Sequence, residues 1–133
     1  MSQENVEIVR AMYRQGDPNR FFELLHRGVQ LDAAKQPLLP DYPELIGGKD
    51  ALVDFYRHYW GTWDKYVLEP AEIIDAGQDR VLVVQDERGI GRGSGAPFER
   101  RWAVLYTMRD AKIVRIEHFS ERRDALEAAG ISE

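Results

Sequence analysis

The 133-residue sequence contains no cysteine. This absence excludes disulfide bonds, thiolate catalysis and metal sites with sulfur ligands, and it fits a reducing compartment. The sequence also lacks any apolar run near the roughly 20 residues that a membrane-spanning helix needs. Its first ten residues, MSQENVEIVR, are polar and have no apolar segment of the kind found in a secretion signal. We therefore expect a cytoplasmic protein with no membrane partner.

Positive charge is scarce as well: 18 lysines and arginines stand against 23 aspartates and glutamates, a net charge of -5. Nucleic acids bind basic surfaces, so we expect no nucleic-acid partner. The three histidines, at positions 26, 58 and 118, share no spacing typical of metal ligands, and we expect neither a metal nor a cofactor. Hydrophobic residues make up 44% of the chain. This length and composition predict one domain over 1–133, with a single core.

Two helices are predicted at the beginning of the chain. Val6, Val9 and Tyr13 share one face of a helix over 3–15. A second helix is predicted over 17–28, with an aspartate cap, proline at its first position and glycine at its end.

A short strand over 29–33 and a loop over 34–47 are expected next. The loop contains prolines at positions 37, 40 and 43, which exclude a regular element. Its length is typical of a rim or lid over a site.

The most regular helical pattern covers 49–64. Six apolar residues lie on one face there, four of them aromatic: Leu52, Phe55, Tyr56, Tyr59, Trp60 and Trp63. Such a stripe is usually buried in a core.

The rest of the chain is predicted to be a β-meander followed by a small helix. The strands cover 66–76, 80–93, 98–109 and 112–119, and a helix capped by Ser120 ends at Gly130. Proline at position 70 indicates an edge strand or a bulge, and short turns require antiparallel neighbours. The element order ααβαββββα predicts an α+β fold: a cone-shaped, curved antiparallel sheet wrapped around the N-terminal and central helices.

Several segments carry a family resemblance, among them GGKDA at 47–51, EPAEIIDAG at 69–77, RGIGRGSG at 88–95 and WAVLYTMRD at 102–110. With them the chain resembles the SnoaL-like branch of the nuclear-transport-factor-two-like superfamily over nearly its whole length. That fold hosts polyketide cyclases, ketosteroid isomerases, dehydratases and epoxide hydrolases. In that fold the helix over 49–64 lines the mouth of a cavity, so part of its aromatic stripe can contact a flat ligand. The resemblance thus implies a ligand pocket formed with the strand over 98–109 and lined by Tyr56, Tyr59, Trp60, Trp63, Trp102 and Tyr106. It also implies a homodimer through the sheet.

Asp32, in the first strand, is the first candidate catalytic residue. Ketosteroid isomerases, which the chain resembles, place a proton-shuttling aspartate in the corresponding strand. A carboxylate at the wall of a dry pocket gains basicity by desolvation, which suits proton abstraction next to a carbonyl. The alternative is a solvent-facing aspartate or an Asx turn that leads into the proline-containing loop.

Tyr13 and His118 are the other two candidates. By the same resemblance, Tyr13 matches an oxyanion-stabilising tyrosine in the first helix; the alternative is a core tyrosine. His118 faces inward if Ile116 does, because side chains alternate along a strand. It could then move a proton near neutral pH, and the alternative is a hydrogen-bonded histidine at a strand end.

Three functions are compatible with these residues. The first is a cofactor-independent cyclase, isomerase or dehydratase that moves a proton on a flat, carbonyl-bearing ligand. The second is a non-catalytic domain that binds a small apolar or aromatic ligand in the same pocket. The third is a protein-association module, which would expose apolar surface and have a filled pocket.

Overall fold

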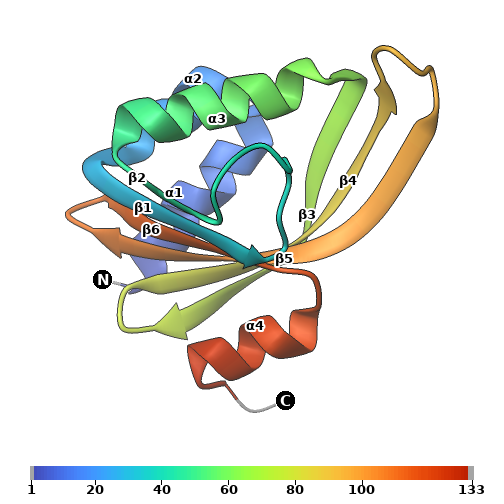
Figure 1. Cartoon of the computed structure of the whole chain (residues 1–133). Helices are drawn as coiled ribbons and strands as arrows, with labels where there is room; N and C mark the ends of the chain where they lie inside the picture. Colours follow the sequence, from blue (N-terminus) through green and yellow to red (C-terminus); the bar gives the residue numbers. More distant parts are fainter. Residues whose placement is uncertain (1, 132–133) are drawn as a thin grey trace.

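The computed structural model of the chain describes residues 2–131, and its elements are shown in Figure 1. The helices are α1 (Ser2–Gln15), α2 (Pro18–Leu24), α3 (Lys49–Gly61) and α4 (Arg122–Ala129). The strands are β1 (Leu25–Lys35), β2 (Leu45–Gly47), β3 (Trp63–Gly77), β4 (Arg80–Gly91), β5 (Pro97–Arg109) and β6 (Lys112–Phe119). The α+β class and the predicted order of the main elements are confirmed. Among the described residues, no helix is both long and apolar enough to cross a membrane.

One curved sheet runs in the order β2-β1-β6-β5-β4-β3. The prediction of an entirely antiparallel sheet is wrong at one pair, because β1 runs parallel to β6. A parallel pair needs a long crossover connection, which the segment 36–111 provides. The loop predicted over 34–47 also ends in a short strand, since β2 pairs antiparallel with β1.

Three predicted boundaries are corrected by tertiary contacts. The second helix ends at Leu24 and not at Gly28, because Leu25 already pairs with β6 in the sheet. Helix α3 stops at Gly61, so Trp63 begins β3 instead of continuing the aromatic face. Ser120 does not cap α4, whose N-cap is Glu121.

Other local predictions are confirmed. The link between β5 and β6 is a two-residue turn with positive φ at both residues, 51° at Asp110 and 64° at Ala111, as expected of the tightest hairpins. Pro70 lies on the edge strand β3, at a shift in its register with β4. Gly130 ends α4 in the left-handed conformation, and the backbone N–H of Ile131 donates to the carbonyl of Leu126 at 3.0 Å.

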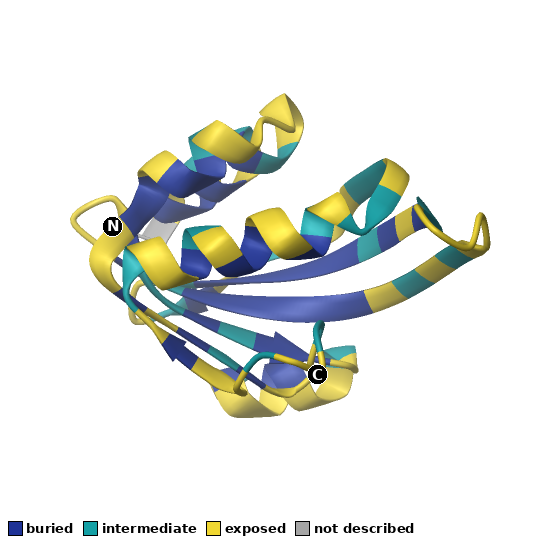
Figure 2. Cartoon of the chain, turned by 45° about the horizontal axis from the view of Figure 1, so that its top comes forward, coloured by how far each residue is buried: buried dark blue, intermediate teal, exposed yellow. Residues whose placement is uncertain are grey.

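The helices lie on the two faces of the sheet (Figures 1 and 2). Helices α1, α2 and α3 cover the inner face, and their inward sides are buried. The larger core lies between these helices and the sheet, around Val9, Leu52 and Ile116. Helix α4 covers the outer face and buries a second, smaller cluster that includes Leu105 and Ala125.

The outer face limits where a second subunit could bind. Its apolar residues Ala103 and Leu105 are buried under α4 of the same chain. The ion pairs of Arg101 with Asp86 and of Arg122 with Glu72 lie on the same face. The homodimer expected from the family resemblance stays a prediction.

Candidate functional site

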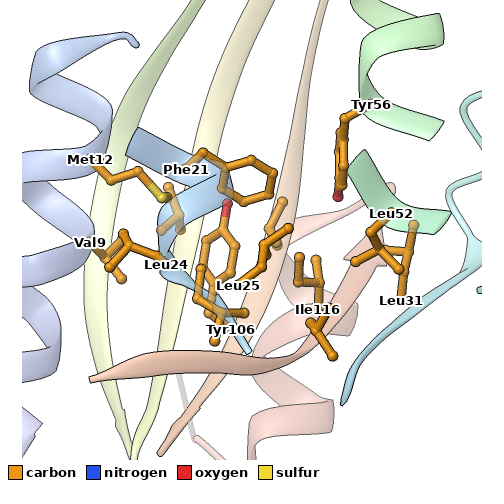
Figure 3. Close-up of a cluster of buried hydrophobic side chains, with 14 of the residues drawn as sticks. Val9, Met12, Phe21, Leu24, Leu25, Leu31, Leu52, Tyr56, Tyr106 and Ile116 are labelled. Carbon is orange, nitrogen blue, oxygen red and sulfur yellow. The ribbon is translucent and has the colours of Figure 1, made fainter. Parts of the chain in front are cut away.

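A cavity of about 440 Å³ lies between the inner face of the sheet and helices α1, α2 and α3. Its rim is exposed at Gly16, Asp17 and Pro18, in the turn between α1 and α2. The lining is mostly apolar and aromatic: Met12, Tyr13, Phe21, Leu38, Tyr56, Tyr59, Trp60, Tyr66, Val67, Leu68, Trp102, Val104 and Tyr106, with the polar side chains Gln85, Glu87 and His118 at the sheet. Figure 3 shows the hydroxyl of Tyr56 directed from α3 towards the sheet, and that of Tyr106 directed from the sheet towards the helices.

Strand alternation positions the polar side chains. Val81 and Val83 face the inner core on β4, so the period of two turns Gln85 and Glu87 to the same face. On β5 the same period aligns Arg100, Trp102, Val104 and Tyr106. The register pairs Glu87 with Arg100 and Gln85 with Trp102. The polar groups of two neighbouring strands therefore meet at the sheet side of the cavity.

Tyr13, Tyr106 and Gln85 form a directed chain of hydrogen bonds. The Tyr13 hydroxyl donates to Oε1 of Gln85 at 2.6 Å. Because that uses its one proton, the hydroxyl of Tyr106, 2.9 Å away, must donate to the Tyr13 oxygen. Burial and the adjacent phenol raise the pKa of Tyr13, and burial raises the pKa of Tyr106 to about 12, so both phenols are protonated at neutral pH.

His118 and Tyr56 form a second polar pair. The Nδ1 atom of His118 lies 3.3 Å from the carbonyl oxygen of Gln36, which can only accept, so Nδ1 carries the proton. Nε2 is then an acceptor for the Tyr56 hydroxyl at 3.3 Å. Burial lowers the pKa of His118 to about 4, and the nearby charge of Arg100 adds to that effect. The imidazole is therefore neutral at physiological pH.

Glu87 is the centre of a third, denser network. Its side chain is fully buried. Oε1 accepts from Nε of Arg100 at 2.7 Å and from the indole of Trp102 at 3.0 Å. Oε2 accepts from the hydroxyls of Tyr59, at 2.9 Å, and Tyr66. Burial and the adjacent carboxylate raise the pKa of both phenols. With four donors, Glu87 has no free lone pair to offer a ligand.

Residues 6–116 match the SnoaL-like domain family. The chain belongs to that family. No curated protein matches the sequence. Three similar solved structures, all under 25% identical, share the fold.

An NTF2-like protein from Burkholderia thailandensis is 24% identical, with 93% of this chain and 95% of that chain covered and a TM-score of 0.72. TerC, co-crystallised with polyporic acid, is 22% identical, with 95% and 98% covered and a TM-score of 0.67. A protein with a ketosteroid isomerase-like fold from Catenulispora acidiphila, in complex with trimethylamine, is 18% identical, with 95% and 94% covered and a TM-score of 0.68.

In this SnoaL-like domain, most of the predicted site residues line one cavity. Tyr13 and His118 are there, together with Tyr56, Tyr59, Trp60, Trp102 and Tyr106. Trp63 is not among the lining residues; it stacks on Phe98 with ring centroids 4.0 Å apart. Its separation follows from the end of α3 two residues earlier.

Asp32 is also absent from the lining. Its neighbours Leu31 and Ala33 face the core, so the carboxylate points to the other face of the sheet. There Oδ1 accepts from the backbone N–H of Ala34 at 3.0 Å, and Oδ2 lies 3.4 Å from Nη2 of Arg115. The structure therefore matches the alternative of an Asx turn, and it does not bring Asp32 together with Tyr13.

Four residues of this SnoaL-like pocket or its wall were not predicted from the sequence: Gln85, Glu87, Tyr66 and Arg100. Alternation along β4 was the available signal for Gln85 and Glu87, because Val81 and Val83 share their face. Among the described residues, no three histidine, aspartate or glutamate side chains lie close enough together to hold a metal ion. The expectation about metals and cofactors stays a prediction.

Proposed function

We propose that this SnoaL-like domain binds a flat, mostly apolar molecule that carries a carbonyl group. The observation that supports the proposal is the cavity itself, about 440 Å³ in volume and lined by aromatic rings with polar groups on the sheet side. Apolar walls with a few fixed polar groups are typical of small-molecule sites, and this volume lies within their usual range of about 300–1,000 Å³. The related fold of TerC, co-crystallised with polyporic acid, is consistent with such a ligand.

Binding is expected to be lost when the cavity is filled. We expect Leu38→Trp to weaken the binding of flat ketones at least about tenfold, because the indole occupies space that Leu38 now leaves open at the cavity wall. Isothermal titration calorimetry with 9-fluorenone, flavone and 2-tetralone measures this change. Leu39→Trp is the matched control, since Leu39 is also partly buried but does not line the cavity. The proposal fails if no ketone binds the wild type saturably, or if both variants bind alike.

Proton transfer on the bound ligand is a second candidate function, favoured by the neutral His118 beside Tyr56. In this reaction a C–H bond next to the carbonyl breaks and its electron pair forms an enolate. The proton joins the Tyr56 oxygen while the hydroxyl proton of Tyr56 passes to Nε2 of His118. The low pKa of His118 makes it a weak base. Since Glu87 is saturated and Asp32 points away, catalysis ranks below binding.

This second candidate predicts hydrogen exchange at carbon. In D2O the wild type should exchange the protons next to the carbonyl of 2-tetralone, and NMR measures the rate. We expect His118→Gln to slow the exchange by roughly 100-fold, the lower range of general acid–base catalysis. A wild-type rate equal to that of buffer alone contradicts the candidate and leaves the binding proposal intact.

The third candidate, a protein-association module, receives less support. It calls for exposed apolar surface, and Leu45 is the one large hydrophobic residue that is exposed within 2–131. It also calls for a filled pocket, whereas the cavity here is open to a ligand. We therefore keep the small molecule as the proposed partner.

A further inference from the structure

In the side-chain amide of Gln85, the oxygen accepts a hydrogen bond from the protein and the nitrogen donates none. The side chain is buried, with 2% of its surface exposed, and it lines the cavity. Oε1 accepts the Tyr13 hydroxyl at 2.6 Å. Among the described residues, Nε2 donates to no group of the protein. It is not among the fully buried polar atoms without a partner, so it keeps accessible surface at the cavity, where a ligand or water can accept from it.

The amide of Gln85 lies with Oε1 towards Tyr13, whose hydroxyl donates to it at 2.6 Å. In this orientation the adjacent hydroxyl of Tyr106 donates to the Tyr13 oxygen. Nε2, with its two hydrogens, is left for a ligand acceptor. A ligand oxygen bound there extends a chain in which every bond runs in the same direction, an arrangement that strengthens each bond.

The charged residues around the cavity argue against a ligand that carries a net charge. Among the described residues, no lysine or arginine lines the cavity, and the adjacent Arg100 is already paired with Glu87, so an anionic ligand finds no free counter-charge. The acidic lining residues are Glu87, whose carboxylate already accepts four donors, and Asp17, which accepts from the backbone N–H of Asn19 at the rim. A cationic ligand therefore finds no free carboxylate in the buried part. Burying an unpaired charge of either sign is strongly unfavourable.

We infer that Gln85 is the specificity-determining residue of this pocket, and that it selects an uncharged ligand whose carbonyl oxygen accepts from Nε2. The inference rests on the proposed function, because it names the chemistry of the ligand in the same cavity. Tyr13 is a positioning residue in this arrangement: it orients the amide of Gln85 and leaves the ligand contact to Nε2.

The test compares three flat probes of nearly the same shape: 9-fluorenone, fluorene and the carboxylate 9-oxofluorene-2-carboxylate. Fluorene has a CH2 group in place of the carbonyl, and the third probe adds a negatively charged carboxylate to the ketone. We expect the wild type to bind 9-fluorenone about tenfold more tightly than fluorene, the effect of one hydrogen bond, and to bind the carboxylate more weakly than the ketone. Titration calorimetry measures all three.

Three variants test whether Gln85 causes the preference for 9-fluorenone over fluorene. Gln85→Met keeps the length of the side chain and removes the donor, so the two uncharged probes should bind with equal affinity. Gln30→Met, at an exposed position of β1, should keep the tenfold preference. Tyr13→Phe frees the amide to turn and should reduce the preference without removing the binding of fluorene.

The outcomes separate the two proposals. Equal binding of fluorene and 9-fluorenone by the wild type overturns the inference and leaves only the binding of a flat apolar molecule in the cavity. The same is true if the carboxylate binds at least as tightly as the ketone. If neither uncharged probe binds, the proposed function fails, and this inference fails with it.

Discussion

Replacing Arg100 with methionine is expected to lower the free energy of unfolding by about 3–5 kcal/mol. The reason is the position of Glu87, whose carboxylate is fully buried and takes its ion pair from Nε of Arg100 at 2.7 Å. The variant leaves that carboxylate with three neutral donors and no counter-charge. Methionine retains the apolar stem of the arginine, so the loss reports mainly on the charge. Urea denaturation followed by circular dichroism measures it.

The neighbouring residue provides the matched control. Arg101 pairs with Asp86 through two hydrogen bonds, 2.7 and 2.9 Å long, but both side chains are largely exposed, at 61% and 40%. Arg101→Met should therefore cost no more than about 1 kcal/mol. Adding Glu87→Gln to Arg100→Met removes the unpaired charge and should recover part of the stability. Equal losses in the two single arginine variants contradict this account.

Which of these two adjacent ion pairs is buried cannot be predicted from the sequence alone. Positions 86 and 87 are both acidic, and positions 100 and 101 are both arginine. Alternation states that one member of each pair faces inward, but it does not state which strand lies opposite or in which register. Only the pairing of Glu87 with Arg100 across β4 and β5 distinguishes the buried ion pair from the exposed one.

Local patterns predicted the elements well because the information they need is local. The aromatic face of α3 follows from the helical period, and the turn at Asp110 follows from its two-residue length. The parallel pairing of β1 with β6 joins segments that are distant in the chain, and no local signal specifies it. Asp32 is a different case, since Leu31 and Ala33 on either side were sufficient to turn it away from the core. There the family resemblance outweighed the alternation.

The second large effect is expected from pH and arises at His118. Its pKa is lowered from the ordinary 6.5 to about 4 in the folded protein, mainly by burial and in part by the charge of Arg100, while the carbonyl of Gln36 and the carboxylate of Asp32 act in the opposite direction. The unfolded chain therefore binds a proton near pH 6.5, whereas the folded chain does not until about pH 4. Stability is lost as the pH falls through this window, because protonation favours the unfolded state.

The size of the loss follows from the same difference in pKa. Two and a half pKa units correspond to roughly 3 kcal/mol, fully expressed at about pH 4 and absent above pH 7. His118→Gln keeps a hydrogen-bonding side chain and removes the titration. The free energy of unfolding of the variant should therefore fall less between pH 7 and pH 4 than that of the wild type, by about that amount.

Comparing the wild type with His118→Gln isolates the effect of the His118 imidazole, because the acidic residues that also titrate below pH 5 contribute equally to both proteins. His58→Gln is the control for histidine replacement in general, since His58 is exposed on α3. Its stability should follow the wild type across the pH range. Parallel curves for His118→Gln and the wild type would mean that the imidazole is already protonated in the folded state at pH 5. His118 would then keep its ordinary pKa in the folded protein, and the predicted pH dependence would be wrong.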